Sequence, residues 1–159
     1  MTIESVKKFF ESVNLNLEII ELQVSTATVA LAAQAFNVEP GRIAKSLAFR
    51  LSDSSVIILV ASGDVRIDNQ KFRQVFGKGK MLAPEEVAHL TGHPVGGVCP
   101  FGLAQPLPIF LDQSLLKFDE LLPAAGSVNS AVRISPQMMA EVTCGQWVDV
   151  CSVPTIVGS

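Results

Sequence analysis

The spacing of apolar and polar residues predicts both helices and strands along the chain. In residues 2–13 the apolar side chains fall three or four positions apart, which predicts an amphipathic helix. Residues 43–51 alternate between two faces, as a strand does, and the uniformly apolar residues 56–61 predict a central strand covered on both faces. Further helices are expected over residues 25–36, 68–76, 84–90 and 136–142, and further strands over 17–22, 107–111, 131–134 and 147–153.

This order of elements bears on the fold class. The strands are short and follow one another closely, which does not suit a doubly wound parallel sheet. The chain length of 159 residues is that of one ordinary domain. We therefore expect residues 1–159 to form a single compact α+β domain with a mixed, curved sheet.

Composition narrows the class of protein further. Apolar residues make up 48% of the chain and charged residues only 17%, which excludes disorder along the whole chain. The most apolar stretch, residues 56–61, is far shorter than the roughly 20 residues of a membrane span. The first ten residues lack the apolar segment of a secretory signal, and the three cysteines are an odd number. These features predict a cytoplasmic protein with reduced thiols and no membrane contact.

The charges are unevenly distributed. A net charge of −3 argues against a protein that coats nucleic acid through bulk charge. Five of the twelve basic residues nevertheless lie close together, at Arg66, Lys71, Arg73, Lys78 and Lys80. This stretch is either the solvated face of a helix or a small surface that contacts phosphate.

Lys45 is a candidate for chemistry because of the face on which it lies. The alternation of residues 43–51 places it with Ile43, Leu47 and Phe49 on the apolar face of a strand. Burying an ammonium group without a partner is costly. Lys45 therefore either extends its amino group to water at the strand end or provides a cation at the mouth of a pocket.

The glycine-rich residues 96–102 form a second candidate. Glycines let the backbone approach a ligand and direct N–H groups at a carbonyl oxygen that becomes an oxyanion. An ordinary Gly/Pro turn is the alternative. Cys99 is either a nucleophile with His93 as its base or a small buried apolar group. His89 and His93 are four residues apart, but the glycine and proline beside His93 break the helix that a zinc motif needs, so no metal is expected.

Several short motifs occur together in one order and spacing. They are IAKSL at 43–47, GDVRID at 63–68, TG at 91–92, GGVCPFG at 96–102, LPI at 107–109 with Asp112, and AGS at 125–127 before ISP at 134–136. In this set the chain resembles the YbaK and prolyl-tRNA-synthetase-associated domain family, the trans-editing aminoacyl-tRNA deacylases. The resemblance covers roughly residues 3–150.

The resemblance implies a fold, an activity and partners. The sheet is expected to be barrel-like and surrounded by helices. The implied reaction is hydrolysis of the ester that joins a small wrong amino acid to the 3′ end of a tRNA, typically the tRNA for proline. The implied partners are the aminoacylated 3′ end of tRNA and prolyl-tRNA synthetase, and no cofactor or metal is implied. Family members lack a protein general base, and a hydroxyl of the terminal adenosine is thought to assist.

The resemblance also assigns residues. It gives catalytic roles to Lys45, Gly96, Gly97, Val98, Cys99 and Pro100, and substrate binding to Ser46, Phe101, Gly102, Gly126, Ser127 and Asn129. Local charge density, and not the resemblance, makes Lys71, Arg73, Lys78 and Lys80 the candidate tRNA contacts. The turn at residues 124–126 reads Ala-Ala-Gly where members that act on cysteinyl-tRNA carry Ser-Gly-Gly, and Ala131 stands where they carry an aspartate. We therefore expect a small apolar pocket that accepts small aminoacyl groups and excludes proline.

Two other function classes remain open at this point. One is a non-catalytic module that binds tRNA or a synthetase, for which the acidic net charge is suited to weak contact. The other is a Cys99-dependent hydrolase of a small thioester or amide. Loss of the ester from a charged tRNA would separate the deacylase from the first, and alkylation of Cys99 would separate it from the second.

Overall fold

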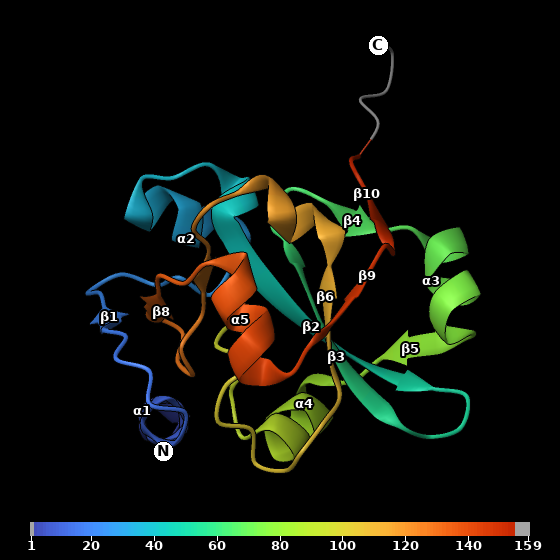
Figure 1. Cartoon of the computed structure of the whole chain (residues 1–159), viewed down its shortest axis with the longest axis horizontal. Coiled ribbons are helices and arrows are strands. Elements are labelled where there is room, and N and C mark those ends of the chain that lie inside the picture. Colours follow the sequence, from blue (N-terminus) through green and yellow to red (C-terminus); the bar gives the residue numbers. More distant parts are fainter. Residues whose placement is uncertain (1, 155–159) are drawn as a thin grey trace.

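The computed structural model describes residues 2–154, which form a mixed six-stranded sheet with helices on both faces (Figure 1). Across the sheet the strands are β5 (Gly79–Met81), β2 (Ile43–Leu51), β3 (Val56–Ser62), β6 (Ile109–Asp112) and β9 (Gln146–Val148), and β7 (Leu122–Pro123) also pairs with β2. β2 is antiparallel to β3 and β5, whereas β6 is parallel to β3 and β9. The expected mixed α+β fold is confirmed.

Two short strand pairs lie outside this sheet. β1 (Ile19–Glu21) pairs with β8 (Ser130–Val132), and β4 (Arg66–Ile67) pairs with β10 (Cys151–Ser152). The barrel-like closure that the resemblance implies is not confirmed. In residues 2–154 the sheet is open, with the three-residue strands β5 and β9 at the two ends of its main path.

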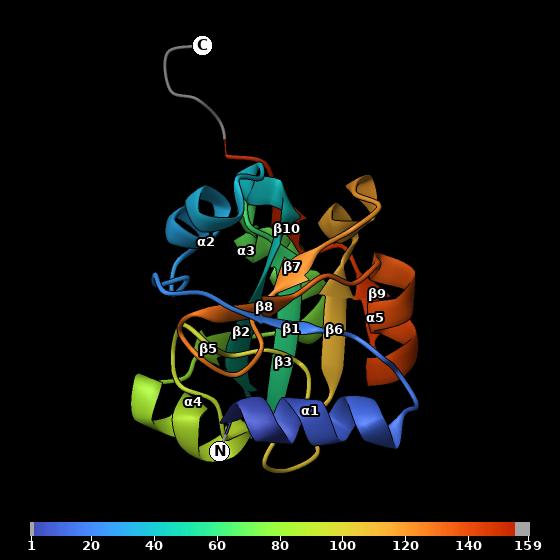
Figure 2. The ribbon, with the colours of Figure 1, turned by 90° about the vertical axis from the view of Figure 1, so that its left-hand side faces the viewer.

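The helices divide between the two faces of the sheet. They are α1 (Thr2–Ser12), α2 (Val29–Phe36), α3 (Asn69–Phe76), α4 (Pro84–Thr91) and α5 (Pro136–Thr143), with 3₁₀ turns η1 (Pro40–Arg42) and η2 (Gln113–Lys117). Helices α1, α4 and α5 contribute to the core cluster that contains Ala44 and Ala48 of β2. Helix α3 packs on the opposite face, where Phe72 contacts Phe49 with ring centroids 4.8 Å apart. In Figure 2, α3 accordingly lies behind the strands.

The alternation expected for β2 is therefore correct. Ala44 and Ala48 face one core, and Leu47 and Phe49 face the other. β3 is buried on both faces, as its uniformly apolar sequence predicts, with Leu59 and Val60 both fully buried.

Two expected boundaries differ in the structure. Helix α2 begins after Thr28, whose hydroxyl accepts a hydrogen bond from Leu31 N–H, and not near Ser25 or Thr26. Thr26 is held in extended chain because its N–H donates to Val128 O (2.6 Å). The single strand expected over residues 147–153 is divided into β9 and β10, because Val150 N–H donates to Asp112 Oδ1 (2.9 Å) between them.

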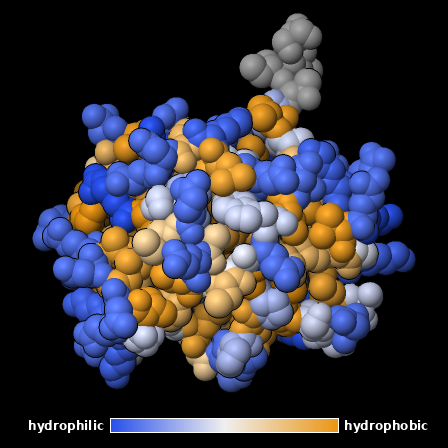
Figure 3. All heavy atoms as spheres, viewed as in Figure 1, coloured by the Kyte–Doolittle hydropathy of each residue, from blue (hydrophilic) through white to orange (hydrophobic). Residues whose placement is uncertain are grey.

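The surface mixes polar and apolar groups. On the face shown in Figure 3, hydrophilic side chains lie between exposed apolar ones. Among residues 2–154, no helix has both the length and the apolar character required to cross a membrane.

Candidate functional site

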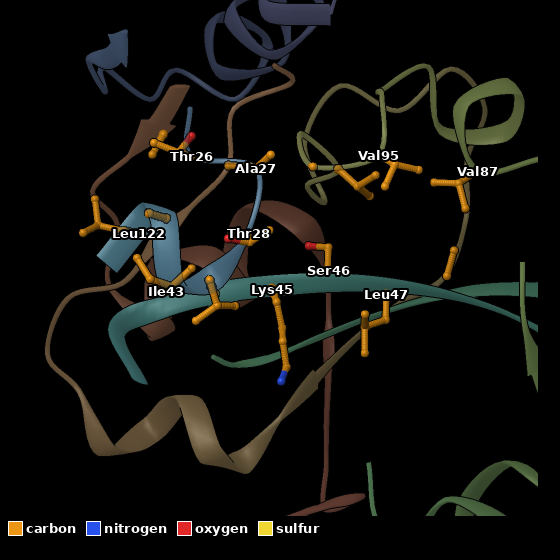
Figure 4. Close-up of a pocket in the computed structure, with 18 of the residues that line it drawn as sticks. Thr26, Ala27, Thr28, Ile43, Lys45, Ser46, Leu47, Val87, Val95 and Leu122 are labelled. Atoms are coloured by element: carbon orange, nitrogen blue, oxygen red, sulfur yellow. The ribbon is translucent and has the colours of Figure 1, made fainter. Parts of the chain in front are cut away.

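A cavity of about 350 Å³ lies beside β2, between α2, α4 and the loop that carries Gly96 (Figure 4). Small or apolar side chains make up most of its wall. They include Ala27, Val29, Ala32, Ala44, Ala48, Leu82, Val87, Val95, Val98, Leu122, Ala124 and Ala131. Its volume is at the lower end of the range for small-molecule sites, roughly 300–1,000 Å³.

The cavity occupies a break along one edge of β2. β7 pairs only with Ile43 and Ala44, and β5 pairs only with residues 49–51. Within residues 2–154 the middle of β2 therefore has no neighbouring strand on this edge, and its residues line the cavity instead. The site is formed by the ends of two very short strands.

The cavity has few polar side chains. Thr26 Oγ1 donates to Val128 O (3.3 Å), and Ser130 Oγ is 2.6 Å from Ser127 Oγ. Ser46 Oγ is different: it is one of two buried side-chain polar atoms in residues 2–154 that have no hydrogen-bond partner, the other being His93 Nδ1. A buried hydroxyl without a partner costs free energy, so Ser46 is available to a polar ligand in the cavity.

Lys45 borders the same cavity but directs its amino group elsewhere. In Figure 4 its side chain extends from β2 on the side opposite to Ser46 and Thr28. The ammonium group donates to Val65 O and is half-buried. Burial lowers the pKa of Lys45, and Cys151 and Asp64 partly oppose this shift. Lys45 thus lies on the apolar face, as predicted. The hydrogen-bond partner of its ammonium group is a main-chain carbonyl, which the sequence alone does not reveal.

The loop before Val98 contributes main-chain groups to the cavity wall. Gly96 has a φ of 91°, in the region that favours glycine, and both Gly96 and Val98 line the cavity. Within the described residues, the N–H groups of Gly96 and Val98 donate to no protein acceptor. Gly97 N–H is already bonded to Pro94 O (2.8 Å), so it is not available to a ligand in this conformation. The two adjacent glycines of the motif therefore differ: Gly96 N–H is available to a ligand and Gly97 N–H is not.

Cys99 and Phe101 lie in the protein interior and not on the cavity. Both side chains are fully buried, and Phe101 packs against Phe10 of α1 with ring centroids 5.0 Å apart. His93 Nε2 is 2.7 Å from Phe101 O and 3.6 Å from Cys99 Sγ. Burial raises the pKa of Cys99 to about 12, so the thiol is protonated at neutral pH, which argues against a thiolate nucleophile.

Gly102, the next residue of the motif, also packs against the rest of the chain. A β-carbon added to Gly102 would come within 2.4 Å of Ser5 O in α1. Pro100 is buried and has no N–H to donate. Residues 100–102 therefore fix the loop to α1, whereas Gly96 and Val98 contribute to the cavity wall.

The turn at residues 126–129 supports the loop from behind. Gly126 N–H donates to Gly97 O (3.1 Å), and a β-carbon on Gly97 would come within 2.7 Å of Ser127 N. Asn129 Nδ2 donates to Leu22 O (2.8 Å). Gly126, Ser127 and Asn129 thus hold the cavity wall in place without lining the cavity.

Residues 23–142 match the aminoacyl-tRNA editing domain family. The chain belongs to this family. The editing domain is 46% identical to the uncharacterized protein YwhH of Bacillus subtilis (strain 168) over 153 residues, 95% of this chain and 98% of YwhH. It is also 24% identical over 129 residues to the proline–tRNA ligase of Aquifex aeolicus (strain VF5), 79% of this chain but 22% of the ligase.

Solved structures agree with this assignment. One is the crystal structure of a protein provisionally assigned as a trans-editing enzyme for prolyl tRNA synthetase. It superposes on the editing domain with a TM-score of 0.87 and 35% identity, covering 95% of this chain and 97% of the other. The hypothetical protein APE2540 gives a TM-score of 0.86 at 29% identity, covering 93% and 99%.

The basic residues of the editing domain differ in their surroundings. Lys71 Nζ is engaged by Asp149 Oδ1 (3.1 Å) and by Cys151 O (3.0 Å). Lys78 and Lys80 are exposed and line a shallow hollow whose wall includes Met81. Met81 also lines the cavity, so this hollow and the cavity share a wall.

The cavity contains no acid or base of the usual catalytic kind. Among residues 2–154, none of the side chains that line it is Asp, Glu, His or Cys. In the same described range no three His, Cys, Asp or Glu side chains come together as metal ligands. The chemistry open to the site is therefore binding, positioning and stabilisation by hydrogen bonds.

Proposed function

We propose that this editing domain is an aminoacyl-tRNA deacylase that hydrolyses the ester of a small, mischarged amino acid in trans. The observation that carries the proposal is the small apolar cavity in a chain of the editing family, bordered by the N–H groups of Gly96 and Val98, which find no acceptor among residues 2–154. A cavity of this kind suits a small side chain, and the N–H groups suit the ester carbonyl.

In the proposed reaction, water adds to the ester carbonyl carbon and the carbonyl oxygen becomes an oxyanion. The N–H groups of Gly96 and Val98 donate to this oxygen as its charge develops. The bond between the carbonyl carbon and the ribose oxygen then breaks, the ribose oxygen takes up a proton, and the free amino acid leaves. Among residues 2–154, no Asp, Glu, His or Cys side chain lines the cavity, and the amino group of Lys45 is directed away from it to Val65 O, so we assign activation of the water to the neighbouring hydroxyl of the terminal ribose.

Lys45 is proposed to bind the substrate from the edge of the cavity. In the free protein its ammonium group donates to an uncharged acceptor, Val65 O. A phosphate of the terminal nucleotide is a charged acceptor and forms a stronger hydrogen bond. The four-carbon stem of lysine is flexible enough to exchange one partner for the other.

The tRNA is proposed to approach over β5. Lys78 and Lys80 are exposed and adjacent to Met81, which forms part of the cavity wall. Phosphates that precede the terminal nucleotide would then meet positive charge just outside the cavity. Similarity to proline–tRNA ligases supports the tRNA for proline as substrate and the synthetase as a partner.

A panel of mischarged tRNAs tests this proposal. Each tRNA carries one labelled amino acid, and loss of the label from the tRNA is followed with and without the protein. We expect alanyl, seryl, cysteinyl or 2-aminobutyryl esters on the tRNA for proline to be hydrolysed and prolyl esters to be spared. Binding of tRNA without loss of any ester would indicate a non-catalytic module instead.

A further inference from the structure

One residue of β2 has main-chain groups at the cavity that pair with nothing else in residues 2–154. In an antiparallel pair, successive residues direct their N–H and C=O groups to opposite edges of the strand. Leu51 N–H donates to Ser55 O (2.8 Å), so the odd-numbered residues of β2 direct their main-chain N–H and C=O groups towards β3. The main-chain groups of the even-numbered residues point to the other edge of β2. There Ala48 O accepts a hydrogen bond from Leu82 N–H (3.1 Å).

Ser46 lies between two paired residues on that edge. Ala44 is paired with Pro123 of β7, and Ala48 is bonded to Leu82 just after β5. In the part of the chain that the structure describes, nothing pairs with the N–H and C=O of Ser46 on this edge, and Ser46 Oγ also lacks a partner. The sheet is thus interrupted by one residue, at a residue that lines the cavity.

We propose that Ser46 binds the aminoacyl group of the substrate through its main chain, as a strand residue would. The inference rests on the proposed deacylase function and identifies the atoms that recognise the amino acid. Ser46 C=O accepts a hydrogen bond from the α-ammonium group, and Ser46 N–H donates to the ester carbonyl oxygen. In an aminoacyl group the ammonium donor and the carbonyl acceptor lie on either side of Cα. Two opposed residues of an antiparallel pair use the same arrangement when each donates its N–H to the C=O of the other.

This contact explains how a site with so few polar side chains recognises an amino acid. The main chain of Ser46 reads the groups that all α-amino acids share, and the apolar walls restrict the size of the side chain. The ester carbonyl oxygen accepts from Ser46 N–H when the substrate binds, and the oxyanion has a third lone pair, so it also accepts from the N–H groups of Gly96 and Val98. Ser46 N–H therefore adds a donor to the two that the loop directs at the developing oxyanion.

The test uses the unaltered protein and two stable analogues of the acylated adenosine. In both, an amide joins the acyl group to 3′-amino-3′-deoxyadenosine; one carries alanine and the other carries propionate, which lacks only the amino group. Binding is measured by calorimetry at neutral pH. Because a hydrogen bond to a charged group is lost, the propionyl analogue is expected to bind at least tenfold more weakly. Equal binding, or no binding of either analogue, would overturn the inference.

The variant Ser46→Ala separates the main chain from the hydroxyl. It keeps the N–H and C=O groups, so the preference for the alanyl analogue should remain within about twofold of that of the unaltered protein. Loss of the preference would assign recognition to the hydroxyl and overturn the main-chain contact. Hydrolysis is measured separately, on alanyl-tRNA: preferential binding without hydrolysis would contradict the deacylase function and leave the Ser46 contact standing.

Discussion

The amino group of Lys45 and the hydroxyl group of Ser46 point to opposite faces of β2, although the two residues are adjacent in sequence (Figure 4). Among residues 2–154, Ser46 Oγ is buried without a hydrogen-bond partner, whereas the Lys45 ammonium group is bonded to Val65 O. A strand produces this division because successive side chains alternate. Substitutions at the two positions should therefore have separable effects.

Lys45→Met should reduce kcat/KM for alanyl-tRNA by roughly ten- to a hundredfold, because a charged hydrogen bond to the substrate is lost. Stability should change little, since the lost bond to Val65 O is offset by removal of a half-buried charge. Single-turnover hydrolysis and urea unfolding measure the two effects. Lys45→Arg retains the charge and should recover part of the rate; near-normal turnover in Lys45→Met would remove Lys45 from the mechanism.

Gly96→Ala tests the loop, with Gly77→Ala as a matched control. Both glycines have a positive φ, 91° and 76°, so an alanine is strained at either position, by roughly 1–3 kcal/mol. Only at Gly96 does the new β-carbon meet a neighbour, 2.9 Å from Ala27 Cβ; at Gly77 nothing lies within 4 Å. We expect kcat to fall roughly ten- to a hundredfold in Gly96→Ala alone. Equal losses in both variants, or a change in KM only, would contradict an oxyanion role.

The double variant Lys78→Gln/Lys80→Gln tests the tRNA path. Each phosphate contact that is lost should reduce the slope of log Kd against log salt by about one unit. The control is Lys7→Gln/Lys8→Gln, which removes the same charge from the exposed side of α1. Binding to uncharged tRNA is measured across a salt series. If both double variants give the slope of the unaltered protein, Lys78 and Lys80 are merely solvated.

Cys99→Ala should retain deacylation, because the thiol is buried away from the cavity. Its effect should instead appear in the pH dependence of stability. Burial raises the pKa of Cys99 from an ordinary value of 9.0 to about 12, so between these pH values the unfolded chain loses a proton that the folded chain keeps. The unfolding free energy then declines by about 1.4 kcal/mol per pH unit as pH rises through this window.

In Cys99→Ala the decline of the unfolding free energy with pH should be smaller, by about 1.4 kcal/mol per pH unit. Urea unfolding at pH 8, 9 and 10 measures it, and Cys144→Ala, at an exposed cysteine, is the control. At pH 8 the variant should be less stable by about 1–2 kcal/mol, because buried volume is lost. Complete loss of deacylation in a folded Cys99→Ala variant would indicate that the thiol is a nucleophile after all.

Ala124→Val should narrow the cavity, because Ala124 forms part of its wall. Hydrolysis of the 2-aminobutyryl ester should fall roughly tenfold relative to that of the alanyl ester. Ala30→Val, on the exposed side of α2, adds the same volume away from the cavity and should leave the ratio unchanged. An unchanged ratio in Ala124→Val would mean that the side chain is held elsewhere.

Local patterns in the sequence predicted the long elements well. The alternation of β2 and the uniformly apolar β3 depend on residues close together in the chain. The cavity depends on where β5 and β7 end against β2. These strands have three and two residues, too few for any periodicity, and their pairing joins distant segments.

The site residues show the same limit. The sequence placed Lys45 on an apolar face but could not show that the cavity opens around the neighbouring Ser46. The glycine-rich motif predicted a ligand-facing loop, yet only the structure separates Gly96, on the wall, from Gly97, packed against Ser127. Cys99 and Phe101 follow directly in the motif and are interior residues, because a motif records spacing and not burial.

The one-residue interruption beside Ser46 also bears on aggregation. An uncovered strand edge is a template on which another chain can pair. Here β7 and β5 occupy the edge on either side of Ser46, so an incoming strand of the usual five or six residues does not fit between them. An edge left open over a longer stretch would admit whole strands, and molecules joined in this way would accumulate. The short strands on either side thus leave too little of this edge for another chain to pair with, while the main chain of Ser46 remains open to the cavity.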